Sequence, residues 1–186
     1  MRKASIERET KETYIKIDIN LDGTGNFDGE YPIPYFKHLL TALSFYAQWD
    51  VNIIAKGDIE VDPHHLIEDT GIVLGEAFIT AIKDSNFNRF SQRIIPMDDA
   101  LVMVVIDISG RPYFSFRDDG ELLKGGLVKE FLRAFVNKAG ITLHIWILSG
   151  ENTHHIEEAI FKGLGLAIKD ASQIIDSLRS TKGRIL

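Results

Sequence analysis

Apolar and polar positions alternate along the chain with two different periods, which predict strands and helices in turn. Thr13–Asn20 (TYIKIDIN) alternates with a period of two, as half-buried strands do. Pro34–Gln48 carries its apolar residues at helical spacing and begins with a proline, which suits the first turn of a helix. The pattern then predicts a strand at Asp50–Lys56 and a helix from His64 to about Asn86.

The second part of the chain repeats this order of elements. Its predicted elements are strands Leu101–Ser109 and Tyr113–Phe116, a helix Gly125–Lys138, a strand Ile141–Leu148 and a helix from about Thr153 to Ser172. Alternation of this kind indicates an α+β fold in which two similar sheet-and-helix layers pack through their helices.

The repeated order reflects an internal duplication that is visible in the residues themselves. The motif His64-His65-Leu66-Ile67-Glu68 recurs as His154-His155-Ile156-Glu157-Glu158, at an offset of 155 − 65 = 90 in a chain of 186 residues. The same offset relates Leu74-Gly75 to Leu164-Gly165. We therefore divide the chain into half-repeats 1–92 and 93–186, which together form one compact catalytic unit.

Composition narrows the range of functions. A hydrophobic content of 45% with 26% charged residues is typical of a globular protein. The absence of cysteine excludes a disulfide scaffold, a thiolate metal site and a cysteine nucleophile. The net charge of −6, with no dense basic segment, argues against nucleic-acid binding. No apolar run reaches the roughly 18 residues of a membrane span, and no signal-peptide core follows Met1, so we expect a cytoplasmic protein.

The histidines are the strongest candidates for chemistry. All six lie in or beside the duplicated elements: His38, His64, His65, His144, His154 and His155. On a helix, residues three or four apart share a face whereas neighbours point about 100° apart, so one motif can serve two metals. With Glu68 and Glu158 the chain offers eight nitrogen and oxygen ligands, enough for two divalent cations that keep open positions. One isolated motif usually caps a helix or lies on the surface, but two copies with the same spacing favour metal binding. The ligand types suit Zn, Fe, Ni, Cu or Mn.

Seven ordered stretches resemble one known family, almost from end to end of the chain. They include Arg8–Thr13, Leu21–Gly25, Gly57–Asp69, Pro96–Leu101, Asp107–Pro112, Gly150–Lys162 and Ser180–Gly183. On these residues the sequence is similar to the imidazoleglycerol-phosphate dehydratases. The resemblance implies a ribosomal protein S5 domain 2-like fold, with helices packed between two mixed β-sheets. It also implies a hydro-lyase of histidine biosynthesis that converts D-erythro-imidazole glycerol phosphate to imidazole acetol phosphate. The resemblance further implies two Mn²⁺ per active site. It also implies a large homo-oligomer, a 24-mer, with active sites between subunits.

The resemblance also assigns roles to particular residues. The metal ligands would be His38, His64, His65, Glu68, His144, His154, His155 and Glu158. The phosphate would be bound by Arg89, Arg111, Ser180 and Lys182 with Lys162 nearby, and Glu12 would reach the glycerol hydroxyls. Arginine suits this role because its planar guanidinium matches phosphate oxygens. Beside His38 the family usually has an acidic residue, a glutamine and a second histidine, where this chain has Lys37, Ala42 and Tyr46.

The implied reaction needs metal because the hydrogen to be lost has no neighbouring carbonyl to acidify it. Two cations at the ring nitrogens would favour an imidazolate that expels the hydroxyl to give a diazafulvene-like intermediate. Glu12 is the candidate for protonating the leaving hydroxyl or for relaying the proton. The base would be Glu158, Glu68 or a metal-bound hydroxide.

Three other functions remain open on the sequence. A dinuclear metal-dependent phosphate-ester hydrolase would need the same metals and basic residues. A ferritin-like protein would use carboxylates and histidines on four long helices, which the alternating strands disfavour. An inactive metal-binding relative of the dehydratase is the third, because of the substitutions beside His38.

Overall fold

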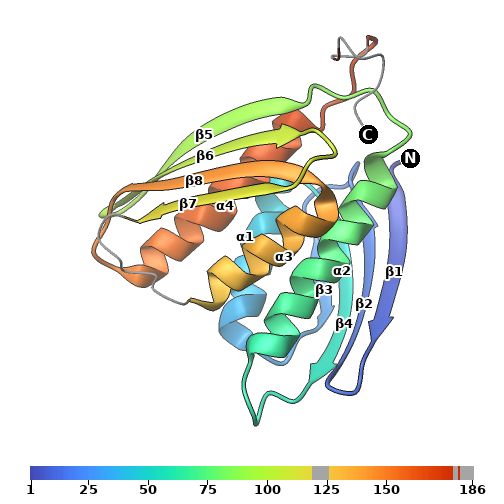
Figure 1. Ribbon diagram of the computed structural model, residues 1–186, viewed down its shortest axis with the longest axis vertical. Helices are drawn as coiled ribbons and strands as arrows, with labels where there is room; N and C mark the ends of the chain where they lie inside the picture. Colours follow the sequence, from blue (N-terminus) through green and yellow to red (C-terminus); the bar gives the residue numbers. More distant parts are fainter. Residues whose placement is uncertain (119–125, 178–179, 181–186) are drawn as a thin grey trace.

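The computed structural model describes residues 1–118, 126–177 and 180, and contains two four-stranded mixed sheets with four helices between them (Figure 1). The first sheet has the order β1-β2-β4-β3, formed by Lys3–Glu9, Thr13–Asn20, Asp50–Gly57 and Phe27–Glu30. The second has the order β5-β6-β8-β7, formed by Phe90–Met97, Ala100–Ile108, Ile141–Ser149 and Tyr113–Asp118. In both sheets the last strand is parallel to its neighbour and the other pairs are antiparallel. The two halves therefore have the same topology.

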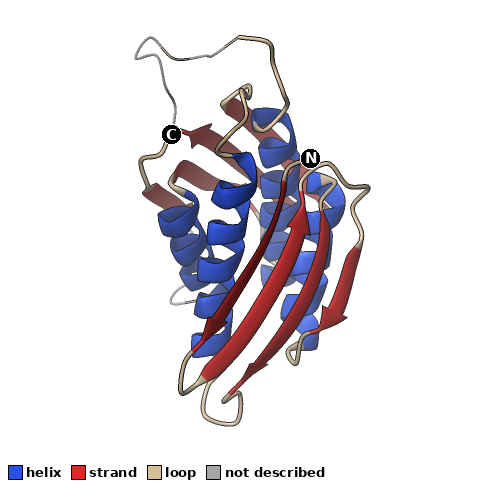
Figure 2. Cartoon of the chain, turned by 90° about the vertical axis from the view of Figure 1, so that its right-hand side faces the viewer, coloured by secondary structure: helices blue, strands red, loops and turns tan. Residues whose placement is uncertain are grey.

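Each helix of one half packs against a helix of the other half. They are α1 (Pro34–Ala47), α2 (His64–Ile82), α3 (Leu127–Ala139) and α4 (Thr153–Ala171). Helix α1 packs against α4, and α2 packs against α3, so each helix pair joins one half to the other. Helix α2 covers strands β1 and β2 of the first sheet, and α4 covers β5 and β6 of the second. Figure 2 shows the helices behind the first sheet.

The core lies between each sheet and the helices that cover it. Inward residues of β2 and β6, such as Ile15 and Val104, are fully buried, as the period-two pattern requires. The rings of Phe36, Phe131 and Phe161 meet where helices from both halves converge, with centroid separations of 5.2, 5.8 and 5.4 Å. Burial of these large rings in one cluster stabilises the two halves as a unit.

Glycines allow the crossing helices to approach closely. A Cβ atom on Gly75 of α2 would lie 2.6 Å from the carbonyl oxygen of Phe135 in α3. A Cβ atom on Gly165 of α4 would lie 2.7 Å from the carbonyl oxygen of Leu43 in α1. The two glycines occupy equivalent positions at the offset of 90, so the duplication includes the helix contacts as well as the histidines.

The α+β fold and the duplicated halves are confirmed, and each predicted strand and helix is present with small shifts at its ends. Three strands were not predicted: β1, β3 and β5. Helix α2 ends at Ile82, shortly before the expected end near Asp84–Asn86, and α3 begins at Leu127. The expected boundary between half-repeats, at residue 92, lies within β5. Among the described residues, no helix combines the length and apolarity needed to cross a membrane.

Candidate metal centre

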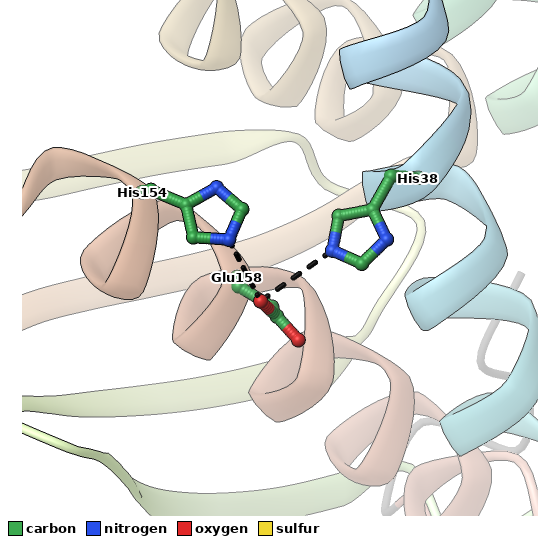
Figure 3. Close-up of side chains that lie close together, drawn as sticks. All are labelled: His38, His154 and Glu158. Carbon is green, nitrogen blue, oxygen red and sulfur yellow. Dashed lines mark ion pairs between the residues drawn. The ribbon is translucent and has the colours of Figure 1, made fainter.

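Three of the candidate ligands converge at the contact between α1 and α4 (Figure 3). The Nε2 atoms of His38 and His154 lie 3.4 and 3.2 Å from Oε2 of Glu158. The two imidazole rings are stacked almost in parallel, with centroids 5.8 Å apart. His154 and Glu158 are one helical turn apart on α4, whereas His38 comes from α1, so helix packing between the halves creates the cluster.

Glu158 is a buried carboxylate held by cationic or protonatable groups. Its Oε1 accepts from the Lys162 amine at 2.9 Å, and its Oε2 faces both imidazoles. Burial opposes ionisation of Glu158, but Lys162 and His38 together outweigh it and lower the pKa of this carboxyl. Glu158 is therefore ionised at neutral pH, as a metal ligand must be.

A second buried carboxylate lies behind this cluster. Glu157 accepts a hydrogen bond of 2.5 Å from the Tyr35 hydroxyl, and the Tyr35 ring is 5.6 Å from the His154 ring. Burial raises the pKa of Glu157, while the bond from Tyr35 acts in the opposite direction. The corresponding residue of the first half is the buried Ile67, so Glu157 is particular to the second half.

The first motif, at the start of α2, is arranged differently. His64 Nε2 lies 3.6 Å from Oε2 of Glu68 one turn away, as His154 does with Glu158. His65 Nδ1 lies 3.2 Å from Asp58 and 3.7 Å from Glu12, and Asp58 raises the pKa of His65 through this hydrogen bond. Glu12, His65 and Glu68 line a pocket of about 240 Å³. A larger hollow of about 710 Å³ lies over the outer face of the first sheet and contains no candidate ligand.

Local hydrogen bonds fix both motifs on their helices. Asp62 accepts from the backbone N–H of His64 at 2.6 Å, and Asn152 accepts from that of His154 at 2.9 Å. These side chains satisfy helix N–H groups that have no partner within the helix. Asp69 of α2 binds Thr13 at 2.5 Å and Arg8 at 2.9 Å, which ties the motif to β1 and β2.

His155 is held by the turn between β5 and β6. Its Nδ1 lies 2.5 Å from Oδ1 of Asp99, and its Nε2 lies 3.5 Å from Oδ2 of Asp98. The hydrogen bond with Asp99 raises the pKa of His155 and depresses the pKa of Asp99 well below its usual range.

His144 lies apart on β8, exposed on the outer face of the second sheet beside the Tyr113 ring. One chain therefore gathers three of the eight candidate ligands into one cluster and distributes the others.

The candidate phosphate residues lie elsewhere. Arg89 binds Asp107 with two bonds of 2.7 and 3.1 Å, and its backbone N–H donates to the carbonyl of Ala171 at the end of α4. Arg111 lies in the turn after β6, where it binds the carbonyl of Ser109 at 3.4 Å. Ser180 is described and has a partner, whereas Lys182 lies outside the described residues. Lys162 donates to Glu158 at 2.9 Å.

Sequence reasoning assigned no role to three residues that contact the histidines, Tyr35, Asp58 and Asp99, nor to Glu157, which binds Tyr35. Asp58 could have been suspected because it shortly precedes the motif at His64. Asp99 precedes His155 by 56 residues, and only the fold brings the two together. Of the residues that depart from the family pattern, Lys37 binds the Gly29 carbonyl at 2.8 Å and the Tyr46 ring lies 5.8 Å from the Lys162 amine.

The chain has a duplicated α+β fold with a cluster of two histidines and a carboxylate between its halves, which could hold a metal ion, and comparison with known proteins identifies the family. Residues 32–168 match the family described as imidazoleglycerol-phosphate dehydratase. The dehydratase of Dictyoglomus thermophilum is 69% identical over all of both chains, and that of Caldicellulosiruptor saccharolyticus is 48% identical over 98% of this chain and 97% of its own. The solved structure from Pyrococcus furiosus, in complex with (S)-C348, has a TM-score of 0.83 at 40% identity and covers 96% and 99% of the two chains. The chain belongs to the imidazoleglycerol-phosphate dehydratase family.

Proposed function

We propose that this chain dehydrates imidazole glycerol phosphate to imidazole acetol phosphate with two Mn²⁺ ions bound by the duplicated motifs. Membership of the family makes the protein a hydro-lyase of histidine biosynthesis. The observation that carries the metal part of the proposal is the convergence of His38, His154 and Glu158 at the contact between α1 and α4.

The geometry of this cluster fits a divalent cation. Ligand atoms bound to one cation at about 2.1 Å in a right-angled arrangement lie about 3 Å from one another. The Nε2 atoms of His38 and His154 are 3.4 and 3.2 Å from the Glu158 oxygen, so small side-chain movements suffice. Two imidazoles and a carboxylate suit Mn²⁺, although Zn²⁺ and Fe²⁺ accept the same ligands. When bound, the cations would supply positive charge that stabilises the deprotonated imidazole ring of the substrate.

The protein's own carboxylates can then be given roles in proton transfer. Glu158 is bound by Lys162 and has a lowered pKa, so it is a weak base and serves as a ligand. Glu68 is half exposed, lies 3.6 Å from His64, and lines the same pocket as Glu12, which makes it the better candidate for removing the substrate proton. Glu12 is more exposed and is free to reach the substrate hydroxyl, where it would protonate the leaving group.

We further propose that neighbouring copies complete each active site. His154 lies at the start of α4, whereas Arg89 is bonded to the last residue of α4. His154 lies 17 residues before Ala171, and a rise of 1.5 Å per residue separates the two by about 26 Å, far more than the length of the substrate. We infer that the metal cluster and the Arg89 that act on one substrate come from different copies.

The outer face of the second sheet offers a surface for such an assembly. Phe90, Ile94, Tyr113 and Leu148 lie on its strands and are each at least 40% exposed. A cluster of apolar side chains of this kind favours contact with another protein surface. We expect a large homo-oligomer, as in the 24-mer implied by the family resemblance. The cytoplasm is the expected location, because a phosphorylated substrate does not diffuse through membranes.

The decisive experiment is turnover of imidazole glycerol phosphate by metal-stripped protein with and without added Mn²⁺. The expected result is manganese-dependent formation of the ketone without release of inorganic phosphate. Release of phosphate would instead indicate an ester hydrolase. Metal binding with neither product would indicate an inactive relative altered around Tyr46. Glu12→Gln should bind Mn²⁺ normally but turn over at least about 100-fold more slowly, as loss of a general acid requires.

A further inference from the structure

Asp99 uses both oxygens of its carboxylate at the start of α4. Its Oδ2 accepts hydrogen bonds from the backbone N–H groups of Glu151 and Asn152, at 2.6 and 3.0 Å. Its Oδ1 lies 2.5 Å from Nδ1 of His155. An ionised carboxylate can only accept hydrogen bonds, so the proton of this contact is on Nδ1 of the imidazole.

This contact determines which ring nitrogen of His155 can bind a cation. A neutral imidazole carries one N–H, and with that proton on Nδ1 the lone pair stays on Nε2. The Nε2 atom faces Oδ2 of Asp98 at 3.5 Å, and the Asp98 side chain is 69% exposed. The free nitrogen therefore points toward solvent and a second carboxylate, which are favourable surroundings for a cation.

We propose that Asp99 is a positioning residue that fixes His155 in the Nδ1-protonated tautomer and so presents its Nε2 atom to a metal ion. This inference rests on the proposed function, which makes His155 a ligand. Hydrogen bonds from outer carboxylates to metal-binding imidazoles generally fix the tautomer and orient the ring. The two bonds from the loop before α4 hold Asp99 itself in place, so the histidine is oriented by backbone rather than by a freely rotating side chain.

The first half achieves the same result with a different residue. His65 Nδ1 is bound at 3.2 Å by Asp58, which comes from the segment between β4 and α2. The carboxylate in the turn between β1 and β2, which is Glu12, lies 3.7 Å from His65 and is 57% exposed. The turns between the first two strands of each half therefore have different tasks: Asp99 orients a ligand, whereas Glu12 is left available for the substrate.

Asp99→Asn tests the proposal with almost no change in shape. Its amide oxygen would remain on the N–H groups of Glu151 and Asn152, which places its NH₂ group against Nδ1 of His155. Nδ1 must then accept, and the proton moves to Nε2, where it blocks metal binding. We would record solid-state ¹⁵N spectra of metal-free protein labelled in histidine, at an alkaline pH that leaves the ring neutral. A His155→Gln sample identifies the His155 signals.

The expected result is a proton on Nδ1 in the wild type and on Nε2 in Asp99→Asn, with Mn²⁺ affinity reduced about 10- to 100-fold. Asp99→Glu should restore the wild-type tautomer and most of the affinity. Glu151→Gln is the control, because it removes a neighbouring charge but keeps the backbone N–H. A wild-type proton on Nε2, or unchanged Mn²⁺ affinity in Asp99→Asn, would overturn the proposal. The spectra and the Mn²⁺ titration require no turnover, so failure of the dehydratase assay alone is a separate outcome.

Discussion

Gly165 and Gly75 provide a matched pair of positions for testing how helix packing builds the metal cluster. A Cβ atom at Gly165 would lie 2.7 Å from the Leu43 carbonyl oxygen, and one at Gly75 would lie 2.6 Å from that of Phe135. Ordinary contacts of this kind begin at 3.4 Å, so each alanine must push its helix pair apart by about 0.7 to 0.8 Å. The carbonyl belongs to helix backbone and cannot rotate away.

Both alanine variants should lose stability by similar amounts. Overpacking of a well-packed contact costs about 1–3 kcal/mol, and the better helix propensity of alanine returns up to about 1 kcal/mol. The net loss, up to about 2 kcal/mol, corresponds to a Tm lower by up to about 8 °C for a chain of this length. Thermal unfolding of the metal-free proteins at equal concentration would measure it.

Only Gly165→Ala should weaken the cluster at His38. It separates α1 from α4, so the 3.4 Å between His38 and Glu158 would grow to about 4 Å. In Gly75→Ala the separated helices are α2 and α3, and His64 and Glu68 remain together on α2. We expect Mn²⁺ affinity to fall at least about tenfold more in Gly165→Ala than in Gly75→Ala. Equal affinities for two equally destabilised variants would refute the claim that the contact between α1 and α4 forms the cation site.

Three further outcomes are expected. Glu158→Gln removes the anion shared by both imidazoles and Lys162, so Mn²⁺ affinity measured by calorimetry should fall at least about tenfold; unchanged affinity would exclude Glu158 as a ligand. Arg89→Lys cannot keep both bonds to Asp107 and should raise KM for the phosphorylated substrate while Mn²⁺ affinity stays constant. Asp99 raises the pKa of His155 in the folded protein. The contact between them therefore adds fully to the free energy of unfolding below about pH 6.5, and this contribution is lost as the pH rises through the pKa of His155 in the folded protein. In urea unfolding of metal-free protein, the free energy of unfolding of the wild type should exceed that of Asp99→Asn by an amount that decreases between about pH 6 and 9. A difference that stays constant over this range would contradict the claim that Asp99 raises the pKa of His155.

The sequence predicted those elements whose burial gives them a clear period. Strand β2 was predicted with its observed ends because its inward residues are fully buried and its outward ones are polar. Strands β1 and β5 lie at sheet edges and have no fully buried residue, so their patterns carry little signal. Strand β3 has only four residues and includes Gly29, which has a positive φ of 110°.

The sequence predicted which residue types form the site, but it did not predict which of these residues lie together in the folded chain. The spacing of His154 and Glu158 places them on one helical face, which the sequence reveals directly. The addition of His38 depends on α1 packing against α4. The pairing of Asp99 with His155 depends on the turn between β5 and β6 lying against the start of α4. Contacts between elements follow from the packing of the whole core, and periodicity along one segment carries no information about them.

The crosswise packing of the helices also bears on how the chain must fold. Every helix of one half is buried against a helix of the other, so a separated half would expose the apolar surface that its missing counterpart should cover. Such a fragment would resemble one subunit of a two-fold dimer that has been separated from its partner subunit. The two halves should therefore unfold in a single cooperative transition, and two fragments made separately should acquire their structure only when mixed.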